Sequence, residues 1–256
     1  MDSYSHFATL YDEFMEDVPY DEWCGFIAGI LKENGIQDSL VCELGSGTGN
    51  ITERMALKGY DMIGIDNSEE MLSVAQNRRM ESEDERVNKI LYLCQDMREF
   101  ELYGTVSAII SSFDSINYIL EDVELEETFR LVNNYLDPKG LFIFDFNTEA
   151  NYRKLDEAAA GSDVIDDVTF TWCNTYDEDQ RINEHELTFF VPSAEDSDLY
   201  RKFTEYHYQR GYKLEEIKDM LKKSGLVFEK AYDGYSFEEA DEESSRIYVV
   251  ARESGK

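Results

Sequence analysis

The stretch VCELGSGTGN, residues 41–50, contains three glycines at every second position directly behind a short apolar run. The apolar run is typical of a buried strand, and Glu43 lies two residues before the first glycine. Because glycine has no Cβ and tolerates positive φ, such a loop lets the backbone approach a ligand closely. The stretch therefore predicts a strand, a ligand-binding loop and a helix that begins near Asn50.

Strand-like and helix-like segments alternate around this stretch. Five apolar runs are expected strands: residues 39–45, 61–66, 89–96, 106–112 and 140–147. Segments with apolar residues at three- and four-residue spacings are expected helices: residues 20–35, 49–59, 68–80 and 125–136. Continuous apolar strands separated by helices indicate an α/β fold, doubly wound, with a mostly parallel sheet and helices on both faces.

The pattern changes between residues 169 and 208 to alternation with a period of two. This predicts antiparallel strands joined by the polar turn DEDQ at 177–180. A helix and two further strands are expected after them, at 213–225, 226–233 and 245–253. We therefore expect three parts: a core with an N-terminal helical cover over 1–150, a β-rich lid inserted after the fifth strand over 151–210, and a return to the core over 211–256.

The chain of 256 residues carries 56 acidic and 24 basic side chains, a formal charge of −32. Such a surface repels phosphate backbones and anionic membranes, so neither nucleic acid nor membrane is an expected partner. The acidity serves solubility or attracts a cationic substrate, and the sequence leaves both open.

The four cysteines are scattered, without a C-x-x-C pair or a histidine at metal spacing: Cys24, Cys42, Cys94 and Cys173. Cys42 and Cys94 fall in expected core strands. Because no signal peptide or membrane span is recognisable, we expect a reduced, cytoplasmic protein without a structural metal. The oligomeric state cannot be predicted from this pattern.

Two cofactor-binding patterns compete for the glycine loop. The nicotinamide fingerprint G-x-G-x-x-G needs glycine at its sixth position, which is Asn50 here. The observed G-x-G-x-G resembles instead motif I of class I S-adenosylmethionine (SAM)-dependent methyltransferases, which have a Rossmann-like fold. The resemblance implies SAM as cofactor and S-adenosylhomocysteine as product. It also implies that four residues of this stretch contact SAM: Glu43, Gly45, Ser46 and Gly47.

The ends of the following strands extend the resemblance over about residues 38–148. Asp66 ends the second strand, where the family places a carboxylate that accepts both ribose hydroxyls. Asn67 would then border the adenine, with Met71 one helical turn further on. Alternatively, Asp66 caps the following helix, a role that Ser68 can fill instead.

The third and fourth strand ends match the family as well. Asp96 and Met97 resemble its adenine-reading pair, a carboxylate for the exocyclic amine and a backbone N–H for a ring nitrogen. The stretch SSFDSINY, residues 111–118, resembles motif IV of small-molecule methyltransferases. The resemblance places these residues beside the methionine portion of SAM or toward the substrate: Ser112 and Phe113, then Asp114, Asn117 and Tyr118.

The N-terminal YSHFATLYD resembles the first helix of bacterial small-molecule methyltransferases, including the glycine N-methyltransferase-like and amino-sugar N-methyltransferase-like groups. In such enzymes this helix folds over SAM, which implies that Tyr4 and Tyr11 reach its carboxylate. The alternative is that both rings only pack on the core.

The β-rich insertion resembles the lid of the same group. The period of two puts Glu205, His207 and Gln209 on one face of a strand, and one face of the lid should look into the cleft. A base is needed only when the acceptor arrives protonated, as most amines do. His207 is the preferred base and Asp114 the second choice, against the alternative that His207 is structural.

These observations together predict a SAM-dependent methyltransferase that moves a methyl group to nitrogen or oxygen of a small-molecule acceptor, an amine or other cation among them. Positioning is the main catalytic device of such an in-line displacement. The alternatives are methylation of a basic protein, aminopropyl transfer on the same fold, and a catalytically idle SAM-binding regulatory protein. Nucleic-acid methylation is disfavoured by the charge and by SSFDSINY in place of an N-P-P-Y-type motif.

Overall fold

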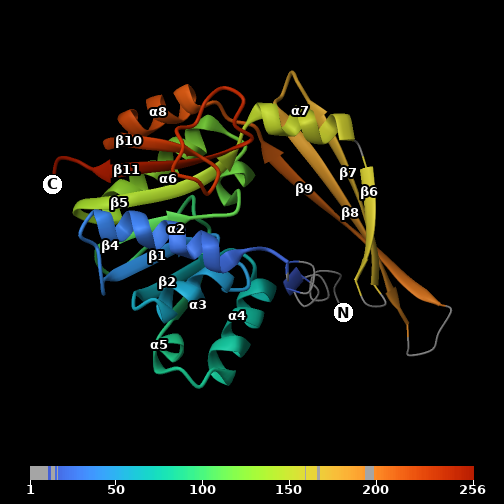
Figure 1. Ribbon diagram of the computed structural model, residues 1–256, viewed down its shortest axis with the longest axis horizontal. Coiled ribbons are helices and arrows are strands. Elements are labelled where there is room, and N and C mark those ends of the chain that lie inside the picture. Colours follow the sequence, from blue (N-terminus) through green and yellow to red (C-terminus); the bar gives the residue numbers. More distant parts are fainter. Residues whose placement is uncertain (1–10, 13–14, 16, 159, 166–167, 194–198) are drawn as a thin grey trace.

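The computed structural model describes residues 11–12, 15, 17–158, 160–165, 168–193 and 199–256. Its core is a seven-stranded sheet in the order β10-β11-β5-β4-β1-β2-β3, in which β11 alone runs antiparallel to the other six strands (Figure 1). The strands are β1 (Leu40–Leu44), β2 (Asp61–Asp66), β3 (Leu91–Cys94), β4 (Val106–Ser111), β5 (Leu136–Asn147), β10 (Leu226–Asp233) and β11 (Arg246–Glu253). The mostly parallel α/β sheet expected from the sequence is therefore confirmed.

Helices cover both faces of this sheet, because successive strand residues point to opposite sides. Phe142 and Phe144 of β5 belong to one buried cluster with residues of α6 and α8. Leu141 and Ile143 belong to the other, with residues of α2, α3, α4 and α5. The helices are α2 (Tyr20–Glu33), α3 (Asn50–Leu57), α4 (Glu69–Glu81), α5 (Glu85–Asn88), η1 (Ser115–Tyr118), α6 (Asp122–Tyr135), α7 (Glu149–Ala158) and α8 (Leu214–Lys223).

The lid is a separate antiparallel sheet in the order β6-β7-β8-β9, which projects from the core (Figure 1). Its strands are β6 (Ala160–Ile165), β7 (Val168–Asp177), β8 (Ile182–Pro192) and β9 (Tyr200–Arg210). The expected turn is present, since Asp177 pairs with Ile182 across it. Helix α7 and strand β6 were not expected, because residues 160–165 alternate only weakly between apolar and polar.

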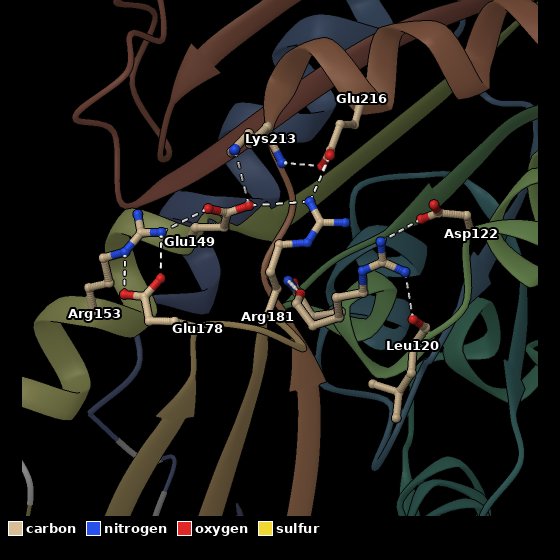
Figure 2. A network of polar contacts seen from close by, with 10 residues as sticks. Leu120, Asp122, Glu149, Arg153, Glu178, Arg181, Lys213 and Glu216 are labelled. Atoms are coloured by element: carbon tan, nitrogen blue, oxygen red, sulfur yellow. Dashed lines mark hydrogen bonds and ion pairs between the residues drawn. The ribbon is translucent and has the colours of Figure 1, made fainter.

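The root of the lid is tied to the core by ion pairs around Glu149, a buried residue at the start of α7 (Figure 2). Arg153 approaches its carboxylate at 3.0 Å, Arg181 of the β7–β8 turn at 3.3 Å and Lys213 at 3.6 Å. Arg181 also lies 2.6 Å from Glu216 of α8. The lid is thus joined to the core through charged groups from three elements.

A second tie lies at the end of β9. Arg210 is 2.7 Å from Asp122 and donates to the carbonyl of Leu120 at 2.7 Å (Figure 2). The Asn117 amide donates to the Arg210 carbonyl at 2.7 Å. These contacts fix the end of the strand from which the lid side chains of the site project.

Three details differ from the sequence-based expectations or lie outside the structure. Cys94 is exposed rather than in the core, because it is the last residue of β3, at the edge of the sheet. Residues 137–139, between the expected helix 125–136 and the expected strand 140–147, belong to β5, where they are part of a bulge: β4 pairs first at Leu136 and then at Leu141. Tyr4 lies outside the described residues. No helix in the described part of the chain is long and apolar enough to cross a membrane.

Candidate active site at the strand ends and the lid

The glycine loop follows β1 and is held against β2. The amides of Gly45 and Ser46 both donate to the carbonyl of Ile65, at 2.8 and 2.9 Å. Gly45 has a φ of 73°, and a Cβ there would lie 2.4 Å from the Ser115 hydroxyl. A side chain at this position would be strained and would collide with η1, so glycine is required. Gly49, with a φ of 83°, precedes α3.

Asp66, the last residue of β2, holds the loop from the other side. One carboxylate oxygen accepts the Gly47 amide at 2.7 Å and the other accepts the Ser68 amide at 2.9 Å. Helix α4 is capped by Ser68, whose hydroxyl accepts from the Met71 amide at 3.2 Å. Since each carboxylate oxygen accepts about two hydrogen bonds, both oxygens of Asp66 keep acceptor capacity toward the cavity.

Glu43 is buried below the glycine loop and accepts a hydrogen bond from the Thr52 hydroxyl. Burial raises the pKa of its carboxyl group to about 8. At neutral pH this carboxyl group is therefore mostly protonated. Glu43 is there mainly a neutral hydrogen-bonding group.

Asp96 follows β3 and lies in an ion pair with Arg98. The closest approach is 2.6 Å, and Arg98 also reaches Glu124 at 3.2 Å. The hydrogen bond from Arg98 holds the pKa of the Asp96 carboxyl below its usual range. Asp96 therefore remains an anion and shares its oxygens between Arg98 and the cavity.

The turn after β4 brings together two consecutive residues with left-handed backbone, Phe113 at a φ of 64° and Asp114 at 53°. Each such conformation costs about 1–3 kcal/mol outside glycine, so neighbouring groups must hold it. The Asp114 amide donates to Asp145 at 3.1 Å. The Phe113 ring lies 5.3 Å from the Trp23 ring of α2.

The Asp114 carboxylate has two partners. Arg246 of β11 lies 2.6 Å from one oxygen, and the Gln209 amide of β9 donates to the other at 2.5 Å. Arg246 also pairs with Asp145 of β5, which is fully buried and whose pKa is raised by burial to about 6. Asp114 therefore joins the ends of β4, β5 and β11 to the lid.

The side chains of Asn117 and Tyr118 in η1 point in different directions. Asn117 is fully buried, donates to the carbonyls of Asn147 and Arg210, and accepts from the Asn147 amide. It does not line the cavity, which corrects its expected place on the substrate side: its amide joins backbone segments instead. Tyr118 does line the cavity, and its hydroxyl lies 3.1 Å from Nδ1 of His207.

The inner face of the lid carries a row of polar side chains. His185 and His207 face each other across β8 and β9. Nδ1 of His185 lies 2.7 Å from the side-chain oxygen of Asn174 on β7. Burial lowers the pKa of both imidazoles, so both are neutral at neutral pH. The structure thus identifies the face of Glu205, His207 and Gln209 as the one that looks into the cleft.

One cavity of 740 Å³ runs from the glycine loop to this lid face. Its volume lies in the range of about 300–1,000 Å³ that is usual for small-molecule sites. The structure brings fifteen of the expected site residues to its wall: Tyr11, Glu43, Gly45, Ser46, Gly47, Asp66, Asn67, Met71, Asp96, Met97, Ser112, Phe113, Asp114, Tyr118 and His207.

Comparisons with known proteins agree with this geometry. A family model described as "Methyltransferase domain" matches residues 41–140. The chain is 34% identical over 252 residues to "Putative methyltransferase YqeM" of Bacillus subtilis (strain 168), with 98% of this chain and 97% of the relative covered. A solved SAM-dependent methyltransferase of Clostridium acetobutylicum ATCC 824 is 31% identical, with a TM-score of 0.84 over 99% of this chain and 100% of the other.

The chain belongs to the class I SAM-dependent methyltransferases. The resemblance drawn from the glycine loop is therefore confirmed, and with it the enzyme class and SAM as the cofactor. At lower identity the fold is also that of CalS10, an amino pentose methyltransferase of Micromonospora echinaspora, with 17% identity, 97% and 96% coverage and a TM-score of 0.74.

The residues of this methyltransferase fit SAM on structural grounds. The cavity wall offers the two oxygens of Asp66 as acceptors for vicinal hydroxyls, and Gly45 and Gly47 leave backbone without side chains beside them. Asp96 and Met97 lie further along the same wall.

Several cavity residues of the methyltransferase were not predicted as site residues. The alternation in the lid put Gln209 on one face with Glu205 and His207, but did not show which face is the inner one; Asn183 and His185 of β8 line the cavity as well. Nothing in the sequence marked Arg246 as a site residue, because a single arginine at the start of the last expected strand is typical of a protein surface. Its role depends on the pairing of β11 with β5, which brings Arg246 next to Asn147.

Proposed function

We propose that this methyltransferase transfers the methyl group of SAM to an amine nitrogen of a small molecule held between the strand ends of the core and the inner face of the lid. One observation carries the proposal. The expected cofactor residues, from Gly45 to Met97, and the lid residues His207 and Gln209 line a single cavity. Its 740 Å³ leave room for a small acceptor beside SAM.

When bound, SAM would supply a methyl group on its sulfonium: the acceptor lone pair bonds to the methyl carbon in line with the carbon–sulfur bond, which breaks, and S-adenosylhomocysteine leaves. The residues of the chain have to align the acceptor with that methyl group and exclude water. The lid contributes to both tasks, because the polar side chains of its inner face, Glu205, His207 and Gln209 among them, face the strand ends across the cavity. The ties at its root hold it in that place.

An ammonium group has no lone pair, so an amine acceptor must lose a proton before it reacts. We assign the acceptance of this proton to His207, whose lowered pKa keeps it in the neutral, basic form at neutral pH. The Tyr118 hydroxyl at Nδ1 orients the ring. Asp114 is less suited as a base, because Arg246 and Gln209 already engage its two oxygens.

The names of structural neighbours support an amine acceptor at the level of the fold. CalS10 is described as an amino pentose methyltransferase, and KedS8 of Streptoalloteichus as a sugar N-methyltransferase. The two matches cover 97% and 94% of this chain.

The proposal is tested by incubating the enzyme with SAM and a panel of small amines and alcohols, following the release of S-adenosylhomocysteine. The product is then examined by mass spectrometry and NMR, and we expect a methyl group on nitrogen. Methylation of alcohols alone, or of a basic protein but no small amine, would contradict it. His207→Ala should retain SAM affinity and lose turnover, while Tyr206→Ala on the outer face serves as its control.

A further inference from the structure

The charged groups that line the cavity are mostly acidic. Four carboxylates, those of Asp66, Asp96, Asp114 and Glu205, line it together with the largely neutral Glu43. Within the described residues its lining contains two guanidinium groups, those of Arg98 and Arg246. The sequence outside the described residues contains no lysine or arginine.

Both guanidinium groups are already neutralised by carboxylates of the protein. Arg98 lies 2.6 Å from Asp96 and 3.2 Å from Glu124. Arg246 lies 2.6 Å from Asp114 and contacts the buried Asp145 as well. An anionic ligand would have to compete with these carboxylates for the same N–H donors, and would leave a buried acidic group without its partner.

The lid does not add positive charge to the cavity. His185 and His207 are neutral at neutral pH, because burial lowers the pKa of both. Arg181 and Arg210 are paired with acidic residues at the root of the lid (Figure 2). Arg201 shares the inner face but lies beyond Phe203, toward the far end of β9, and is not part of the cavity wall.

Beside these carboxylates, the polar side chains on the acceptor side are mostly neutral amides. Amide side chains from the end of β5, from α7 and from three lid strands line it: Asn147, Asn151, Asn174, Asn183 and Gln209. Amides both donate and accept hydrogen bonds, which suits hydroxyl groups, whereas a phosphate needs cations or several N–H donors. The charge of −32 on the whole chain also concentrates cations and repels anions at the cavity mouth.

Building on the proposed function, we infer that the acceptor is a hydroxylated amine without a phosphate or nucleotide group, and that the site rejects the phosphorylated form of the same amine. The amine enters as a cation toward the carboxylates that line the cavity, and its hydroxyl groups form hydrogen bonds with the lid amides. Any phosphorylation or nucleotide activation in the same reaction sequence would then have to come after this methylation or be reversed before it.

The test uses two matched pairs as probes, D-glucosamine with D-glucosamine 6-phosphate, and 2-aminoethanol with its phosphate ester. Each compound is titrated calorimetrically into the enzyme saturated with S-adenosylhomocysteine, at low and at high ionic strength. We expect at least one amine to bind, at least a hundredfold tighter than its phosphate, and more weakly at high salt. Equal or tighter binding of a phosphate overturns the inference, and so does the absence of binding by both amines at millimolar concentration.

A charge variant supplies a second readout. Glu205→Gln should weaken binding of the amine by at least fivefold and leave SAM affinity unchanged. Glu184→Gln, on the outward face of β8, is the matched control and should change neither value. If Glu205→Gln bound the amine as tightly as the unmodified enzyme does, the cavity carboxylates would not be the recognition element.

The inference and the proposed function fail in different ways. N-methylated glucosamine 6-phosphate as a product would overturn the inference and leave amine methylation intact. A product methylated on oxygen, formed from an unphosphorylated amino alcohol, would overturn the proposed function and leave the charge preference intact.

Discussion

Replacing Asp66 by alanine should weaken SAM binding by at least tenfold without unfolding the protein. Both oxygens of Asp66 accept one backbone amide and keep capacity for one ligand hydroxyl each. Hydrogen bonds to a charged group contribute about 1.5–3 kcal/mol each. Loss of one such bond corresponds to more than tenfold in affinity, and loss of two to about a hundredfold or more.

The assay is calorimetric titration of the variant with SAM and S-adenosylhomocysteine, with thermal unfolding measured alongside. Asp61→Ala is the matched control, since Asp61 begins the same strand and is exposed. Asp66→Asn should lose nearly as much as alanine, because its NH₂ group would face the amide donor of Gly47 or Ser68. Affinities of Asp66→Ala and Asp61→Ala within threefold of each other would refute the ribose assignment.

Three further predictions follow from the same geometry. Gly45→Ala should reduce the free energy of unfolding by about 1–3 kcal/mol and weaken SAM binding, because alanine would be strained at this positive φ. Gly25→Ala is the control and should be neutral or stabilising, since Gly25 lies in α2 with open space around it. Equal effects of the two substitutions in denaturant titrations would contradict the strain argument. The Glu43 carboxyl ionises near pH 4.5 in the unfolded chain and only near pH 8 in the folded protein, so the free energy of unfolding should fall as pH rises through this window, by up to about 5 kcal/mol. Glu43→Gln should lack this fall, and parallel pH profiles of the two proteins would contradict the buried, neutral acid. Glu149→Gln should lower the free energy of unfolding by about 2 kcal/mol and speed hydrogen exchange at the root of the lid, because it removes the carboxylate that three basic side chains share. Glu157→Gln on the same helix is the control and should do neither. An unchanged exchange pattern in Glu149→Gln would contradict the role of these ion pairs.

Much of the core could be predicted because its signals are local. The glycine loop after β1, the acidic residue at the end of β2 and the apolar runs each follow from neighbouring residues, and parallel strands then place their ends at one edge. Asp66 and Gly47, nineteen residues apart, meet for this reason.

The rest depends on contacts between distant residues. The alternation with a period of two showed which residues of β9 share a face. It did not show which face looks into the cleft, because the orientation of the lid depends on how its root packs against α7 and α8. Asn117 has the polarity of a substrate ligand, yet its three hydrogen bonds go to backbone groups up to 93 residues away. Arg246 joins the site only through the pairing of β11 with β5.

The contact between Trp23 and Phe113 has a practical consequence for spectroscopy. The chain contains two tryptophans, Trp23 beside the turn after β4 and Trp172 in β7 of the lid. With Trp172 replaced by phenylalanine, the tryptophan fluorescence would report on the turn after β4 alone. With Trp23 replaced instead, it would report on the lid alone. The arrival of cofactor and the response of the lid can thus be timed separately, in stopped flow, without an added label.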